Sequence, residues 1–270
     1  MYSESFEYFR PRTLAEAAKL LKKHKGSRLL AGGHSLLPAM KFRLATAKAL
    51  VDLGAIAGLS GIKAKGKTLE IGATTTHAEI AASPLIRKSC PILSEAASQI
   101  GDIQVRNRGT IGGSIAHADP AADLPTVLVA LGATIVVKGP KGVRTIRAEN
   151  FFVDLFTTAL KAGEIVTSIV VPSYRKGTGG AYFKHPHPAS RYAVVGVAVL
   201  VQMEAGKVSL SRIVVGGASP TPVAVDSPED IAGAISDPLS DTYASGEFRV
   251  HLATVLAKRA IETAAGRARG

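Results

Sequence analysis

Two glycine-rich stretches limit the folds that are open to this sequence. The second of them, residues 108–125, contains Thr-Ile-Gly-Gly-Ser at residues 110–114. Glycine allows positive φ and lets a ligand approach the backbone closely. Peptide N–H groups that converge in such a turn can bind a phosphate without any positive side chain. The sequence therefore predicts an anion-binding turn here, followed by a helix that begins at Asp123.

The earlier stretch, residues 29–38, reads Leu-Leu-Ala-Gly-Gly-His-Ser-Leu-Leu-Pro and has the same character. Two such loops together predict a ligand that carries two phosphates. A single Gly-Gly-x-Ser sequence, however, is usually only a tight turn. A third copy at residues 215–220 is predicted to be structural. For the first two stretches the residues alone leave both interpretations open.

The charge of the chain does not by itself indicate nucleic acid. The net charge is +12, from 33 basic and 21 acidic residues, and such an excess can attract nucleic acid or an anionic membrane. The densest basic cluster, Lys19–Arg28, lies at the end of an amphipathic helix, where cations favour the helix dipole. No recognition motif accompanies the charge, and the chain has no Trp for stacking bases. We predict no nucleic-acid partner; docking to an acidic subunit is the other use of this surface.

Cys90 is the single cysteine of the sequence. It allows no internal disulfide, which is typical of a reducing compartment, and it cannot supply the four thiolates that an iron–sulfur cluster usually needs. We expect it to be a buried bystander. The first residues lack the basic and apolar regions of a signal peptide, and the longest apolar run, residues 194–201, is too short for a bilayer. These features predict a cytoplasmic protein without a transmembrane segment.

The hydrophobic pattern predicts an α+β chain in three parts, with boundaries near residues 55 and 177. Strands are expected at residues 6–9, 28–31, 50–53, 62–71 as a hairpin, 133–147 as a second hairpin, 164–172, 182–185, 193–204 and 208–215. Helices are expected after Thr13 and Thr76, each with a Glu three residues on as in a capping box, and at residues 91–100, 124–131, 228–235 and 248–265.

Several motifs in a fixed order connect these parts. They are Ala-Gly-Gly-His-Ser-Leu-Leu-Pro at residues 31–38, Thr-Ile-Gly-Gly-Ser at 110–114 and Ala-Asp-Pro-Ala-Ala-Asp-Leu-Pro at 118–125. Phe-Arg-Pro at 9–11 and Arg-Val-His-Leu at 249–252 belong to the same set. Together they resemble the FAD-binding medium subunit of molybdenum hydroxylases, the carbon monoxide dehydrogenase and xanthine dehydrogenase family. The resemblance covers nearly the whole chain.

The resemblance implies a fold and three domains. Residues 1–55 and 56–177 would form a two-part FAD-binding region of the vanillyl-alcohol oxidase type. Residues 178–270 would form a C-terminal domain with a three-stranded antiparallel sheet and helices. The dinucleotide-binding pattern Gly-x-Gly-x-x-Gly is missing from the two stretches, which agrees with a fold other than the Rossmann fold.

The resemblance also implies how the cofactor is held. Backbone N–H groups of residues 31–35 and 110–114, with the hydroxyls of Ser35, Thr110 and Ser114, would bind the FAD pyrophosphate. Asp123 would accept a hydrogen bond from a sugar or ribityl hydroxyl, cap its helix, or do both. His34 would contact the flavin without a covalent bond.

Two residues of the C-terminal part are expected at the flavin. Lys184 matches a lysine whose charge would stabilise the anionic reduced ring, and Tyr192 matches an aromatic residue that covers one face. For Ile100, Val166, Tyr192 and His117, ordinary structural roles stay open. The predicted cofactor-binding residues are Ala31, Gly32, Gly33, His34, Ser35, Leu36, Ile100, Thr110, Ile111, Gly112, Gly113, Ser114, His117, Asp123, Val166, Lys184 and Tyr192; no catalytic or metal-binding residue is expected in this chain.

The function implied by the resemblance is electron transfer through FAD. A large partner subunit would oxidise substrate at a molybdenum cofactor, and a small partner would pass electrons through [2Fe-2S] clusters to this chain and on to an external acceptor. A dimer of heterotrimers is expected, associated with the inner face of the membrane only through the complex. Two alternatives are a self-contained oxidase with covalent FAD at His34 and a nucleotide-binding module without a redox role.

Overall fold

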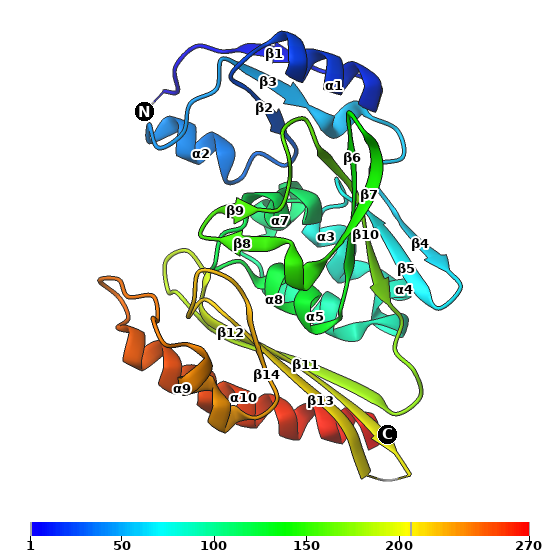
Figure 1. The fold of residues 1–270 in the computed structure, drawn as a ribbon, viewed down its shortest axis with the longest axis vertical. Coiled ribbons are helices and arrows are strands. Elements are labelled where there is room, and N and C mark those ends of the chain that lie inside the picture. Colours follow the sequence, from blue (N-terminus) through cyan, green and yellow to red (C-terminus); the bar gives the residue numbers. More distant parts are fainter. Residues whose placement is uncertain (1, 206, 270) are drawn as a thin grey trace.

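The computed structural model describes residues 2–205 and 207–269. Three sheets of three, five and four strands follow one another along the sequence, and they occupy successive levels of the molecule from the N-terminal end to the C-terminal end (Figure 1). A two-stranded sheet accompanies the middle level. The mixed α+β class is therefore confirmed. No helix in this described part of the chain is long and apolar enough to cross a membrane.

The first level is a small parallel sheet. Strand β3 (Ala49–Asp52) lies between β1 (Glu7–Phe9) and β2 (Ser27–Leu30). Helix α1 (Leu14–Lys23) has the predicted start, since the Thr13 side chain accepts a hydrogen bond from the Glu16 N–H at 3.1 Å. After β2 the chain passes through the first glycine-rich stretch into a short helix, α2 (Leu36–Lys41), which the sequence did not predict as a helix.

The middle level is an antiparallel sheet covered by short helices. Its strands are, in spatial order, β4 (Ile62–Lys65), β5 (Thr68–Gly72), β10 (Ile165–Pro172), β6 (Thr134–Gly139) and β7 (Gly142–Arg147). Its helices are α3 (His77–Ala82), α4 (Pro84–Ser89), α5 (Pro91–Ser98), α6 (Ile103–Arg108), α7 (Ile111–His117) and α8 (Asp123–Ala130). The hairpin β8 (Phe152–Asp154) and β9 (Thr157–Thr158) adjoins them. Thr76 and Glu79 form the complete capping box that the sequence predicted.

The third level is the C-terminal sheet. Its order is β11 (Thr178–Pro186), β12 (Ala193–Glu204), β13 (Lys207–Gly216) and β14 (Val223–Val225). The three long predicted strands are confirmed, but the sheet has a short fourth strand, so the prediction of a three-stranded sheet is corrected. Strand β14 is only three residues long and follows a Ser-Pro-Thr-Pro turn, which hid it in the sequence.

The two faces of the C-terminal sheet pack against different helices. Val195, Val197 and Val199 of β12 share a core with the long helix α10 (Gly246–Arg269), whereas Ala198 belongs to the core of the middle level. Burial on both faces explains the apolar run at residues 194–201, because every side chain of a central strand then needs to be apolar. Helix α8 lies against β12 and β13 and connects the two levels. A short helix, α9 (Ile231–Ala234), follows β14.

Candidate cofactor-binding site

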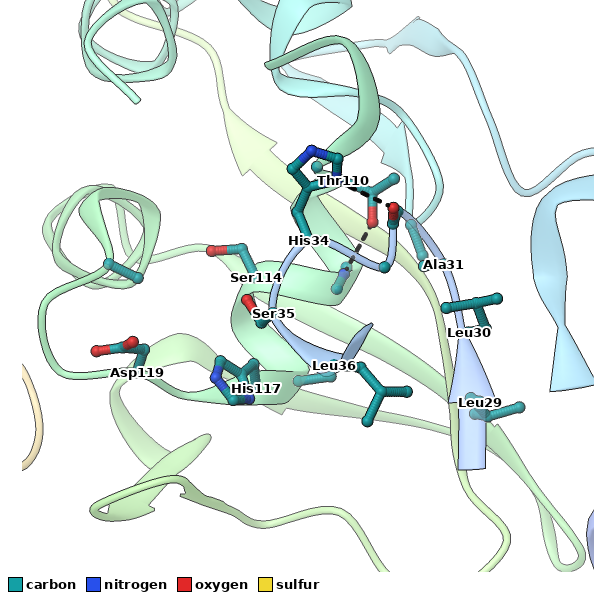
Figure 2. Close-up of a pocket in the computed structure, with 18 of the residues that line it drawn as sticks. Leu29, Leu30, Ala31, His34, Ser35, Leu36, Thr110, Ser114, His117 and Asp119 are labelled. Atoms are coloured by element: carbon teal, nitrogen blue, oxygen red, sulfur yellow. Dashed lines mark hydrogen bonds between the residues drawn. The ribbon is translucent and has the colours of Figure 1, made fainter. Parts of the chain in front are cut away.

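A cleft of about 500 Å³ receives residues from all three levels of the molecule. Its walls come from β2 and the first glycine-rich stretch, from α7 and the segment 116–123, and from the segments 160–166 and 190–192. Figure 2 shows the first stretch together with Ser114, His117 and Asp119. The two glycine-rich stretches therefore meet at one cavity, as the sequence predicted.

The first stretch presents unused backbone donors to this cleft. Within residues 2–205 and 207–269, no protein acceptor bonds the N–H groups of residues 31–35. Gly33 has φ +77°, a conformation that favours glycine. A Cβ on Gly32 would collide with the Arg108 carbonyl, so glycine is required where the two stretches touch. Free N–H groups that share one concavity suit an anionic group such as a pyrophosphate.

The second stretch is a helix and not an open turn. Ile111 and Gly112 donate their N–H groups to the carbonyls of Thr75 and Ala73, at 3.0 and 2.8 Å. The N–H groups of Gly113 and Ser114 bond the Thr110 side chain and carbonyl, at 3.1 and 2.9 Å. The expectation that these four N–H groups bind the phosphates is therefore wrong. Helix α7 instead lines the cleft through Gly112, Gly113 and Ser114.

Two histidines lie near the contact between the stretches. His77, at the start of α3, is 5% exposed and lines the cleft, and its Nδ1 is a buried atom without a partner. Burial lowers the pKa of His77 to about 4, and the positive charge of Arg106 acts in the same direction. His77 is thus neutral at physiological pH. His34 is exposed, with Nδ1 at 3.4 Å from the Gly32 carbonyl oxygen.

Asp123 is held by side chains from the C-terminal sheet. Its Oδ1 accepts a hydrogen bond from the Tyr182 hydroxyl at 2.7 Å and lies 2.9 Å from Lys184 Nζ. Burial raises the pKa of Asp123, while Lys184 and the Tyr182 hydroxyl oppose that rise. The N-cap of α8 is Ala122, so the helix-capping role considered for Asp123 is not what the structure shows.

Tyr192 lies at the cleft mouth, at the end of a tight loop. Its carbonyl accepts a hydrogen bond from the His187 N–H at 2.8 Å, and the next residue, Ala193, donates to the Ala121 carbonyl at 3.1 Å. Tyr192 is 40% exposed, so ordinary core burial does not describe it. His117 also lines the cleft, with its ring 5.1 Å from that of Phe156.

All but two of the predicted cofactor-binding residues line the cleft. Ile111 is fully buried in the core of the middle level, and Lys184 lies behind Asp123. The sequence analysis missed several other residues that line the cleft. Asp119 lies within the second stretch and could have been found from its position in the Asp-Pro motif. The others carried no such signal; they include Leu29, His77, Leu160 and Ile165.

Comparisons with known proteins agree with this site. Residues 4–174 match the family described as the FAD binding domain in molybdopterin dehydrogenase. The carbon monoxide dehydrogenase medium chain of Hydrogenophaga pseudoflava is 38% identical, over 98% of this chain and 98% of its own. The 6-hydroxypseudooxynicotine dehydrogenase complex subunit alpha of Paenarthrobacter nicotinovorans is 35% identical, over 100% of this chain and 97% of its own.

The fold agrees as well. A solved structure of carbon monoxide dehydrogenase from Hydrogenophaga pseudoflava, which lacks the Mo-pyranopterin moiety of its molybdenum cofactor, matches with a TM-score of 0.93 and 37% identity over 99% of both chains. The chain belongs to the family of FAD-binding subunits of molybdenum hydroxylases, and it is a subunit of an oxidoreductase. The predicted resemblance is confirmed, and it is favoured over the self-contained oxidase and the nucleotide-binding module.

Proposed function

We propose that this chain binds FAD noncovalently in the cleft and passes electrons from partner subunits to an external acceptor. The observation that carries the proposal is the row of unpaired N–H groups at residues 31–35, which faces a cavity shared with the N-terminal end of α7. A pyrophosphate supplies the anionic oxygens that such donors need. The residues present therefore fit FAD.

Different lining residues suit different parts of the cofactor. Leu29, Leu160 and Val166 provide apolar walls, which suit an aromatic base. Asp123 and Tyr192 provide a hydroxyl acceptor and an aromatic ring, beside which we place the ribityl chain and the flavin. The other predicted site residues that line the cleft complete this assignment. When bound, FAD accepts and releases electrons, and the protein positions and tunes it.

The partners follow from the family and from the cysteine content. Relatives are named as medium chains and complex subunits, so we infer a larger and a smaller partner. With Cys90 as its single cysteine, this chain cannot hold an iron–sulfur cluster, and we assign the [2Fe-2S] clusters to the small partner and the molybdenum cofactor to the large one. We propose a dimer of heterotrimers. Sedimentation of the co-expressed complex tests that stoichiometry.

The relatives act on chemically different substrates, since their names specify carbon monoxide and 6-hydroxypseudooxynicotine. We infer that the substrate is selected by the molybdenum subunit and not by this chain.

We also propose domain boundaries near residues 55 and 177, supported by the three sheets that these boundaries separate. A cytoplasmic location, with membrane contact only through the complex, is tested by fractionation of cells that express all subunits.

The decisive experiment is a visible absorption spectrum of the purified chain, with FAD added if it is colourless, before and after acid precipitation. Flavin bands that move to the supernatant are expected, because no covalent bond would hold the cofactor. Colour that stays in the pellet would instead indicate covalent attachment, with His34 as the first candidate. Failure of both the chain and its purified complex to bind FAD would contradict the proposal.

A further inference from the structure

Three side chains form a buried unit behind the flavin end of the cleft. Tyr182 and Lys184 extend from β11 and both reach Oδ1 of Asp123, which begins α8. The side chains of Lys184 and Asp123 are 3% and 5% exposed, and Tyr182 is 2% exposed. One carboxylate oxygen therefore receives a hydroxyl and an ammonium group, both protected from water.

The Lys184 ammonium has no hydrogen left for a ligand. Besides Asp123, it donates to the carbonyl of Gln99 at 2.8 Å and to the carbonyl of Arg191 at 2.9 Å. Arg191 immediately precedes Tyr192 at the cleft mouth. Lys184 thus fixes a carboxylate and a loop that both face the cofactor, while its charge stays behind them.

The second oxygen of Asp123 has a different environment. No other side chain in the described parts of the protein bonds Oδ2, and Asp123 lines the cleft. We propose that Tyr182 is a positioning residue for the cofactor: with Lys184 it occupies Oδ1 of Asp123 and leaves Oδ2 to accept a hydrogen bond from a cofactor hydroxyl. This inference rests on the proposed binding of FAD in the cleft.

Removal of the Tyr182 hydroxyl should weaken cofactor binding by an amount that depends on pH. The buried carboxylate would keep Lys184 and its own backbone N–H as donors but lose the hydroxyl, and burial favours its protonated form. A protonated Asp123 is a weaker acceptor for the cofactor. The groups that face Asp123 are Lys184 and Tyr182 from β11, with Tyr192 and its neighbour Asp119 across the cleft. Of these, only the Tyr182 hydroxyl changes in a Tyr182→Phe variant.

The test is a fluorescence titration of the full chain with FAD at pH 6, 7 and 8. For Tyr182→Phe we expect affinity roughly tenfold below wild type at pH 6, because the buried Asp123 is then partly protonated, with recovery toward pH 8 as it ionises. Tyr174→Phe is the matched control. Tyr174 is a partly buried tyrosine that packs against the core of the middle level, its hydroxyl has no hydrogen-bond partner among the described residues, and it contacts Gly180 of β11.

Asp123→Asn provides a second variant that cannot titrate. It should bind FAD weakly at all three pH values. Equal affinity of Tyr182→Phe and wild type at every pH would overturn the inference, and so would a loss that is the same at every pH, since that is the signature of a merely structural change. Wild type that binds no FAD, either as the chain alone or in its purified complex, would contradict the proposed function itself.

Discussion

Lys184 Nζ lies 2.9 Å from Asp123 Oδ1, and the pair joins the C-terminal sheet to the first residue of α8. Helix α8 packs against β12 and β13 on one side and begins at the cleft on the other. The C-terminal sheet therefore helps to hold a residue that lines the cleft. The same ammonium holds the loop that ends at Tyr192.

Asp123 and Lys184 are expected to contribute to the free energy of unfolding as a coupled pair. Lys184→Met should lower the free energy of unfolding by about 3–5 kcal/mol, because a buried carboxylate is left without its cation. Adding Asp123→Asn to Lys184→Met should restore part of that loss, since neither charge then remains. Urea unfolding of the two single variants and the double variant measures the coupling. Additive losses would show that the ion pair does not behave as a buried unit.

Gly32 should tolerate no side chain. In Gly32→Ala the new methyl group would collide with the Arg108 carbonyl and separate the two glycine-rich stretches. We expect a stability loss of about 1–3 kcal/mol and loss of FAD from the purified protein. Gly233→Ala is the control, because a Cβ there meets nothing within 4 Å and the residue lies in α9. Full FAD content in Gly32→Ala would contradict the assigned contact.

His77 should make the protein less stable in mild acid. Its pKa is about 4 in the folded protein, below the value of 6.5 for an unperturbed histidine. The unfolded chain then binds more protons between these values, so stability is complete above pH 6.5 and falls toward pH 4, by up to about 3 kcal/mol. As the pH is lowered from 7 to 4.5, the urea midpoint should fall less in His77→Gln than in wild type. His251→Gln, which changes an exposed histidine, is the control, and its urea midpoint should fall as that of wild type does. Parallel curves of midpoint against pH for all three proteins would refute the role of His77.

Cys90 should be inert in the folded protein. It is fully buried, as the sequence analysis expected, and burial raises the pKa of its thiol to about 12. Since the thiolate is the reactive form, an aromatic disulfide reagent should label it only after unfolding. Labelling in urea gives the reference value for one thiol. Rapid labelling without denaturant would show that the surrounding core opens readily.

The elements predicted well are those with strong local signals. The Thr13 cap of α1 and the capping box of α3 identify both helix starts, because the side chains there accept hydrogen bonds from nearby N–H groups. Strand β12 of the C-terminal sheet has a long apolar run. Helices α2, α6 and α7 have six or seven residues each, too short for a hydrophobic period, and α7 contains two glycines.

From the sequence alone follow the family, the two stretches that meet at the cleft, and fewer than half of the residues that line it. These follow because the ligand-facing glycines and hydroxyls are clustered in short motifs. Only the tertiary structure decided which N–H groups are free. Residues 111–114 use theirs within the protein, because Ala73, Thr75 and Thr110 supply acceptors beside them. Likewise, the sequence assigns Asp123 to a helix start or a cofactor, whereas the fold also brings Tyr182 and Lys184 to one of its oxygens, since strand β11, far away in the sequence, packs beside it.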